Sequence, residues 1–235
     1  MEVQIAVAKV RKYATPDSGD TVEVVERPQG GVSVVLADGQ SSGRGAKSVS
    51  NLVVRKVISL LAEGVRDGAA ARAASDSLFT ERQGKVSATL NIVSVDLKSR
   101  TLLVTRNNPA PALVAHGVDI QVLEQPSKPV GLYRDTRPVI SEEKLIAGLT
   151  VLVYTDGLVH AGDRSGGRLD VPAALRELLQ NAAITPQAIA DSLLDQAVRL
   201  DFGRPVDDVS VVVLRVSPLQ GDEVRRMNVR LPLGG

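Results

Sequence analysis

The stretch VSVVLADGQSSGRGAKS, residues 32–48, decides how the rest of the sequence is interpreted. It begins with an apolar, β-branched run that is typical of a buried strand, and this run ends at Asp38 and Gly39. A Gly/Ser segment follows, and the apolar residues then change to helical spacing from Val49 and Val53 onward. The stretch therefore predicts a buried strand whose last carboxylate stands close to the start of a helix.

The other segments form runs of strands with helices in pairs between them. Strands are expected at 3–10, 21–26, 32–37, 86–96, 101–106, 111–115, 119–123, 149–155 and 208–216, and further helices at 69–81, 172–180 and 185–199. Residues 125–141 are expected to be a long loop. This order lacks strict strand–helix alternation, so it predicts an α+β fold of packed antiparallel sheets with helices on the outer faces. One domain is expected over residues 1–217, and alternating apolar residues in the tail 218–235 favour an added edge strand.

The composition excludes several classes of function. The 235 residues include 28 Lys and Arg and 27 Asp and Glu, so the overall charge gives no argument for nucleic-acid binding. Because there is no cysteine, disulfides, thiolate metal sites and cysteine nucleophiles are excluded. The N-terminus lacks the pattern of a secretory signal, and no stretch approaches the roughly 20 apolar residues of a membrane span. We therefore expect a cytoplasmic protein with neither a nucleic-acid nor a membrane partner.

Carboxylates stand at the ends of several apolar strands. Asp20 comes just before one strand, Asp38 and Asp156 each follow a buried run and precede a glycine, and Asp207 and Asp208 precede the last strong strand. An antiparallel sandwich can bring such ends to one edge, where carboxylates repel one another unless a cation compensates. Oxygen ligands without His or Cys suit Mg²⁺ or Mn²⁺. Asp-Gly is also a common turn pair, so only the coincidence of these positions favours a metal site.

Four segments carry a resemblance to a known family. They are SGD at 18–20, VVLADGQSSGRGA at 34–46, VYTDGLVHAG at 153–162 and DDVSVVVLRV at 207–216. With weaker matches at NNPAPALV and KPVGL, the chain resembles the metal-dependent protein phosphatases of the PP2C type, and specifically their bacterial stage II sporulation E and sigma-factor regulation branch. The resemblance implies a β-sandwich of two antiparallel sheets flanked by helices.

The resemblance also implies a centre of two Mn²⁺ or Mg²⁺ ions at one edge of the sandwich. The implied ligands are the backbone carbonyl of Gly39 and the carboxylates of Asp20, Asp38, Asp156, Asp207 and Asp208. Asp38 would bridge the ions, Asp156 and Asp207 would complete one ligand set, Asp20 would serve the other ion, and Asp208 would be a supporting or alternate ligand. A metal-activated water would attack phosphoserine or phosphothreonine. The implied substrates are phosphorylated regulatory proteins, such as STAS-type anti-sigma-factor antagonists in stress-response signal transduction.

Some roles stay open at the level of sequence. Residues 40–42 replace the segment in which eukaryotic members carry a histidine that can act as general acid, so water and His160 are the alternative proton sources. Arg11, Lys12 and Arg44 are candidate phosphate contacts, although solvated surface charge is the simpler explanation of each.

Three other functions fit parts of the sequence. A nucleotide-binding loop between strand and helix fails at Ser41 and Ala46, where the P-loop spacing requires glycine. A catalytically inactive binding module of the same fold has no chemical need for the five aspartates, and all five are present. A phosphatase of the same fold that acts on a small phosphorylated metabolite is compatible with every motif.

Overall fold

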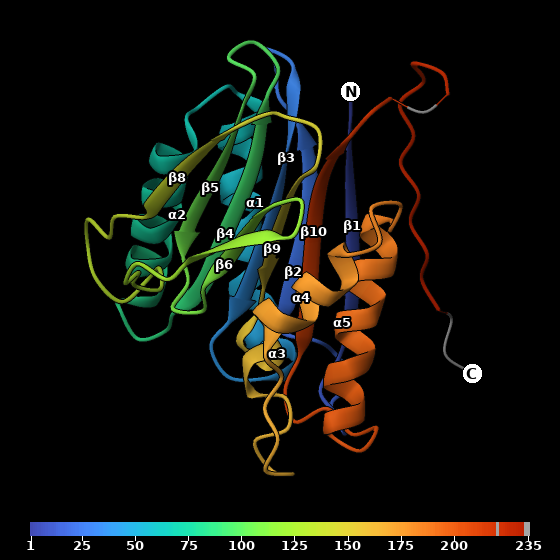
Figure 1. The fold of residues 1–235 in the computed structure, drawn as a ribbon. Helices are drawn as coiled ribbons and strands as arrows, with labels where there is room; N and C mark the ends of the chain where they lie inside the picture. The colour runs from blue at the N-terminus through green and yellow to red at the C-terminus, as the bar shows by residue number, and fades with distance from the viewer. Residues whose placement is uncertain (220, 233–235) are drawn as a thin grey trace.

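The computed structural model describes residues 1–219 and 221–232. The chain forms two five-stranded antiparallel sheets that pack face to face, with strand orders β1-β10-β9-β6-β7 and β2-β3-β4-β5-β8 (Figure 1). The strands are β1 (Glu2–Val10), β2 (Asp20–Glu26), β3 (Gly31–Gly39), β4 (Ala88–Asp96), β5 (Thr101–Asn107), β6 (Ala112–His116), β7 (Asp119–Leu123), β8 (Val139–Lys144), β9 (Leu149–Tyr154) and β10 (Val209–Ser217). The helices are α1 (Gly43–Ala62), α2 (Asp67–Arg82), α3 (Asp156–His160), α4 (Val171–Leu179) and α5 (Pro186–Leu200).

Three apolar layers hold the sandwich together. The middle layer lies between the sheets and joins β3, β4 and β5 to β6, β9 and β10, with Leu36 and Leu214 among its members. One outer layer packs α1 and α2 on the second sheet, and the other packs α3, α4 and α5 on the first. Because β3, β9 and β10 are covered on both faces, their sequences are nearly continuous apolar runs. The predicted α+β sandwich of two antiparallel sheets flanked by helices is confirmed.

One strand lies partly inside the predicted long loop. The sequence VISEEK of β8, at Val139–Lys144, pairs with β5 at the edge of its sheet, so the loop predicted over 125–141 ends earlier than expected. The residues of β8 alternate between partly buried and exposed, and three of the six are charged. An edge strand with one solvated face needs few apolar residues, which is why composition alone did not indicate it.

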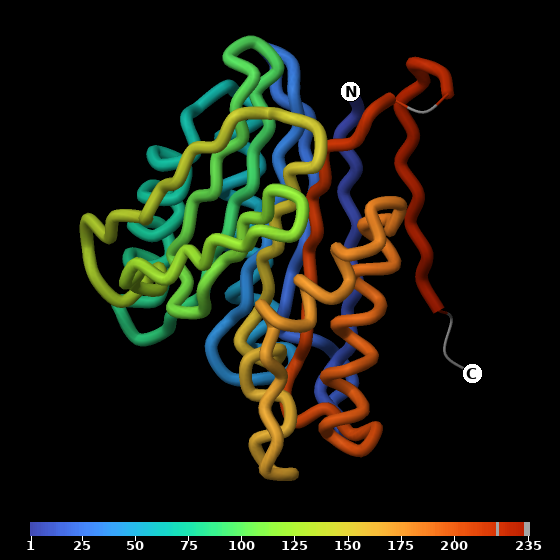
Figure 2. Tube along the Cα trace, viewed as in Figure 1, coloured from blue at the N-terminus to red at the C-terminus, as the bar shows by residue number. Residues whose placement is uncertain are grey.

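The predicted edge strand in the C-terminal tail is wrong for the described residues. Residues 221–232 pair with neither sheet, and Figure 2 shows this segment running outside the sandwich. Val229 is 85% exposed and Leu231 is 76% exposed, so the alternation of apolar residues buries nothing. One surface ion pair, of 3.4 Å between Arg225 and Glu26, links the tail to β2.

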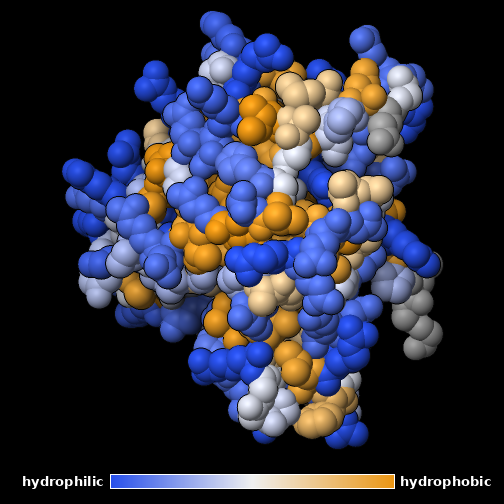
Figure 3. Space-filling model, viewed as in Figure 1, coloured by the Kyte–Doolittle hydropathy of each residue, from blue (hydrophilic) through white to orange (hydrophobic). Residues whose placement is uncertain are grey.

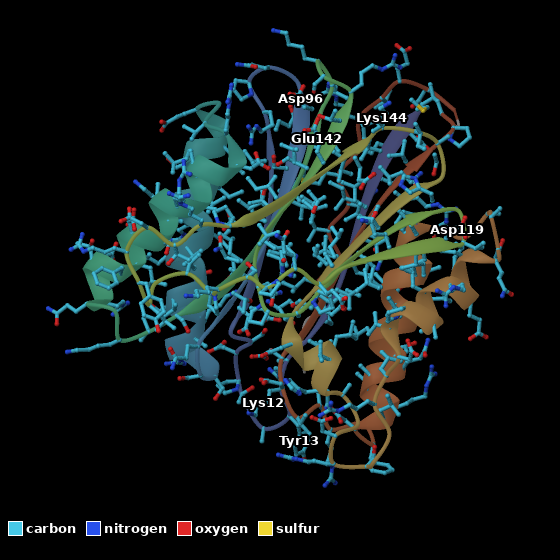
Figure 4. The ribbon with its side chains drawn as sticks, turned by 60° about the vertical axis from the view of Figure 1, so that its left-hand side comes forward. Lys12, Tyr13, Asp96, Asp119, Glu142 and Lys144 are labelled. Atoms are coloured by element: carbon cyan, nitrogen blue, oxygen red, sulfur yellow. The ribbon has the colours of Figure 1, made fainter. Side chains whose placement is uncertain are left out.

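The two ends of the sandwich carry different residues. Lys12 and Tyr13 lie at one end, and Asp96 and Lys144 lie at the other (Figure 4). The face shown in Figure 3 is mostly hydrophilic, with a hydrophobic band across its centre over β6 and β7. None of the helices in the described part of the chain is both long and apolar enough to cross a bilayer.

Candidate metal centre

The β2–β3 hairpin brings two of the predicted residues into direct opposition. Asp20, the first residue of β2, pairs with Asp38 near the end of β3. Opposed residues of an antiparallel pair have Cβ atoms about 5 Å apart and their side chains on the same face of the sheet. Two carboxylates are therefore adjacent, and they lie at the end of the sandwich that carries Lys12, because Asp208 binds the backbone of both Lys12 and Gly19, the residue before Asp20.

Asp20 is fixed by residues from distant parts of the chain. Its Oδ2 accepts hydrogen bonds from Ser210 Oγ at 2.6 Å and from Thr155 Oγ1 at 3.1 Å. Lys9 and Lys47 both donate to its backbone carbonyl, at 2.5 and 2.6 Å. The side chain is fully buried, yet Oδ1 has no hydrogen-bond partner. A buried, held carboxylate with one free oxygen is suited to binding a cation.

Asp38 is the electrostatic centre of the cluster. Burial and the nearby carboxylates of Asp20, Asp156 and Asp207 raise the pKa of Asp38 to about 9. Burial likewise raises the pKa of Asp20 to about 6, although its hydrogen bond from Ser210 opposes the rise. These carboxylates repel one another without a compensating charge, and a divalent cation would supply that charge.

Asp156 and Asp207 bring their carboxylates from the other sheet. Asp156 follows β9 as the first residue of α3, and Asp207 stands two residues before β10. Both are partly buried, and burial together with the charge of Asp207 raises the pKa of Asp156. Asp207 Oδ1 accepts from the backbone N–H of Asp208 at 2.9 Å, which orients its side chain.

Asp208 is occupied in holding a loop. Its Oδ1 accepts from the backbone N–H of Lys12 at 2.9 Å, and its Oδ2 accepts from that of Gly19 at 2.8 Å. These two bonds close the loop between β1 and β2, which delivers Asp20 to the cluster. Since both carboxylate oxygens are engaged with the backbone, the contacts of Asp208 are those of a supporting residue.

Two glycines let the backbone approach closely at this edge. A Cβ atom on Gly39 would collide with the carbonyl oxygen of Ala46 in α1, and one on Gly157 would collide with the carbonyl oxygen of Asp208. The α1 helix is also tied to the Asp20 loop, because Ser50 Oγ donates to the Gly19 carbonyl at 2.5 Å. The Asp-Gly pairs thus meet a steric requirement of the packing around the carboxylates.

The remaining predicted residues lie outside the cluster. Arg11 donates to the Pro16 carbonyl at 2.9 Å, and Arg44 pairs with Asp17 at 3.3 Å. His160 ends α3, one helical turn after Asp156, and its Nδ1 lies 3.1 Å from Asp163. The contacts of Arg11 and Arg44 are those of surface residues.

Sequence reasoning missed the residues that support the aspartates. Thr155 and Ser210 stand within the TDG and DDVS segments, so the hydroxyl beside each acidic motif was the available signal. Asp201 also supports this edge, because its two oxygens accept from the backbone N–H groups of Gly162 and Val206 at 2.9 and 3.0 Å. A lone aspartate at a helix end gives no sequence signal for such a role.

The donor set fits a hard divalent cation. Carboxylate oxygens, one of them buried and unpartnered, are the ligands that Mg²⁺ and Mn²⁺ prefer. In the part of the chain that the structure describes, no three Asp, Glu or His side chains are already gathered closely enough to form a finished metal site. Mutual repulsion of carboxylates opposes such an approach, and after burial this repulsion is the main cause of the raised pKa of Asp38.

Comparisons with known proteins identify the family. Residues 28–217 match the family described as Stage II sporulation protein E (SpoIIE). The chain belongs to the SpoIIE family. It is 22% identical to Stage II sporulation protein E of Bacillus subtilis (strain 168) over 200 residues, which are 85% of this chain and 24% of that relative. The chain therefore spans about a quarter of the length of this SpoIIE relative.

Solved structures share the fold of this SpoIIE family member. The PP2C phosphatase domain of SpoIIE from Bacillus subtilis, with a fragment of its regulatory domain, superposes with a TM-score of 0.79 at 21% identity, over 94% of this chain and 64% of that chain. The catalytic domain of the serine/threonine protein phosphatase PstP, in complex with two manganese ions, gives 0.67 at 19% identity, over 92% and 99%. The architecture is thus that of PP2C-type phosphatases.

Proposed function

We propose that this chain is a metal-dependent phosphatase that hydrolyses phosphoserine or phosphothreonine in a regulatory protein. Membership of the SpoIIE family and the PP2C-type fold support the class of reaction. The observation that carries the proposal is the carboxylate cluster. In it Asp38 lies opposite Asp20, and the charges of Asp156 and Asp207 act on the Asp38 carboxyl group. In keeping with the family resemblance, a phosphorylated anti-sigma-factor antagonist is the expected kind of substrate.

Each residue has a distinct task in this proposal. Asp38, with the backbone carbonyl of Gly39, would hold both cations, Asp156 and Asp207 would hold one of them, and Asp20 would reach the other through its unpartnered Oδ1. Bound divalent cations lower the pKa of a water and neutralise charge on phosphoryl oxygens.

Supporting residues keep this arrangement in place. Asp208 holds the loop that carries Asp20, and the hydroxyls of Thr155 and Ser210 fix the Asp20 carboxylate. Water or His160 would return a proton to the leaving serine oxygen. His160 lies close enough to Asp156 for its protonated form to oppose the rise in the pKa of that carboxyl group.

The test is hydrolysis of a phosphoserine peptide and of p-nitrophenyl phosphate in EDTA, in Mg²⁺ and in Mn²⁺. We expect turnover only with metal, and loss of turnover in Asp38→Asn but not in the matched control Asp119→Asn, because Asp119 is exposed and lies away from the end of the sandwich that carries Lys12. Hydrolysis of p-nitrophenyl phosphate with no hydrolysis of any phosphopeptide would favour a small-molecule phosphatase. Metal binding and turnover both absent would favour the inactive binding module.

A further inference from the structure

A hollow of about 460 Å³ lies at the end of α5, against the segment that leads into β10. It is lined by Arg164, Leu200, Asp201, Phe202, Arg204 and Val206. Its lining residue Val206 directly precedes Asp207, and its lining residue Arg204 contacts Tyr13, at the end of the sandwich that carries Lys12 (Figure 4). Asp201 joins two of the surrounding loops by accepting from the backbone N–H groups of Gly162 and Val206. The walls of the hollow are therefore held in a defined arrangement.

Phe202 occupies a position whose backbone conformation favours glycine. It follows the C-cap of α5 with φ 54°, in the left-handed region, and its backbone N–H donates to Arg199 at 3.0 Å. Gly203 N–H donates to Val198 at 2.8 Å, which completes the usual helix-ending motif. A bulky side chain in this conformation is strained, and this one is also 81% exposed. Since neither backbone nor core benefits from the ring, the phenyl group points to a role in binding.

Two arginines and one aspartate line the hollow. Arg164 and Arg204 make no ion pair within the described ranges, 1–219 and 221–232. The Arg204 guanidinium lies 5.2 Å from the centre of the Tyr13 ring, where a cation–π contact orients it. The acids nearby are engaged, because Asp163 pairs with Arg168 and Asp201 accepts backbone N–H groups. Two guanidinium groups without an ion-pair partner in the described part of the chain thus line the hollow together with an exposed aromatic ring.

We propose that this hollow is the specificity pocket of the phosphatase site. It receives an apolar side chain of the substrate peptide near the phosphoserine, packed on Phe202, while Arg164 and Arg204 bind a neighbouring carboxylate. The inference rests on the proposed function and specifies which kinds of residue lie next to the phosphoserine in the substrate. A wider hollow of about 820 Å³ along α1 and α2 contains no aromatic residue to anchor a peptide.

The test compares two phosphoserine peptides of equal length, one with Leu and Glu next to the phosphoserine and one with Ser and Lys there. With Mn²⁺ we expect kcat/KM to favour the Leu–Glu peptide by about tenfold, mainly through KM. Phe202→Gly and Arg204→Ala should each lower this ratio to about threefold or less. Because the ratio is taken within one variant, a general loss of activity cancels. Tyr133→Ala and Arg134→Ala, an exposed aromatic and an arginine in the loop before β8, should keep the wild-type ratio.

A second measurement tests the pocket without turnover. Fluorescein-labelled, unphosphorylated versions of the peptides should bind the wild-type chain with Kd values that differ in the same direction, and Phe202→Gly should reduce the difference to about threefold or less. Equal Kd values in the wild type, or a ratio of Kd values that is the same in Phe202→Gly as in the wild type, would overturn the pocket. Failure of the proposed function looks different, since neither p-nitrophenyl phosphate nor either peptide would then be hydrolysed, whatever the binding shows.

Discussion

Burial and the charges of three other carboxylates all raise the pKa of the Asp38 side chain. Asp38→Asn removes its charge and leaves its size almost unchanged, so the fold should survive. Loss of the central ligand should lower Mn²⁺-dependent hydrolysis by about 100-fold or more. Relief of repulsion should raise the free energy of unfolding of the metal-free protein by about 1 kcal/mol or more. Enzyme assays with Mn²⁺ and urea denaturation in EDTA measure the two effects, and full activity in Asp38→Asn would contradict the site.

The raised pKa values of Asp20 and Asp38 predict how stability depends on pH. Both carboxyls bind protons more tightly in the folded chain than in the unfolded chain, with pKa values of about 6 and about 9 against 3.8. The stability that they contribute is complete below about pH 4 and is lost as the pH rises toward 9. In EDTA the Tm should therefore fall from pH 5 to pH 9, and the fall should be smaller in Asp38→Asn. A Tm that rises over this range in EDTA would contradict the raised pKa values of Asp20 and Asp38.

At the scale of elements, the loop between β1 and β2 depends on Asp208. Asp208→Ala leaves the N–H groups of Lys12 and Gly19 without their acceptors, which should lower the free energy of unfolding by about 2–4 kcal/mol. Because the loop carries Asp20, the Mn²⁺ concentration for half-maximal activity should also rise. Urea denaturation in EDTA and metal titration measure these effects. Unchanged stability with complete loss of metal binding would instead show that Asp208 is a direct ligand.

The end of α5 gives a second prediction at this scale. Phe202→Gly places glycine at a position of positive φ, which relieves about 1–2 kcal/mol of strain and costs about 0.5–1 kcal/mol of backbone entropy. The free energy of unfolding should therefore be unchanged or higher by about 1 kcal/mol. Thermal denaturation measures it. A clear loss of stability would mean that the Phe202 ring packs in the folded chain and is not reserved for a ligand.

Much of the fold could be predicted because its signals are local. Continuous apolar runs predicted β3, β9 and β10, and the carboxylates at their ends placed Asp38 and Asp156 in the candidate site. The support of Asp20 could not be predicted in this way, because its bond to Ser210 joins residues 190 positions apart. Sequence spacing carries no information on such a contact before the sheet order is known. The edge strand β8 was not predicted for a different reason. One of its faces is exposed to solvent, so its sequence has few apolar residues to indicate a strand.

For the whole molecule, metal binding should be visible as stability. Ligands that bind only the folded chain stabilise it by about 2.7 kcal/mol at 100 times Kd, and for a chain of this size that corresponds to a rise in Tm of roughly 5–10 °C. Titration with Mn²⁺ or Mg²⁺ should show this rise, and EDTA should reverse it. In Asp38→Asn the rise should be much smaller, whereas Asp119→Asn should match the wild type. An identical shift in Asp38→Asn would mean that the metal binds elsewhere.

The pairing of β1 with β10 sets how the domain can be joined to other polypeptides. Glu2 pairs with Ser217 and Val10 pairs with Val209, so the first and last strands run side by side. Nine residues of strand, roughly 30 Å, separate the Glu2 end from the end where the aspartates gather. A fusion partner attached at either strand would therefore point away from the substrate.

A short bridge between the two strands would also permit circular permutation, with new termini opened in an exposed turn such as the one at Lys98.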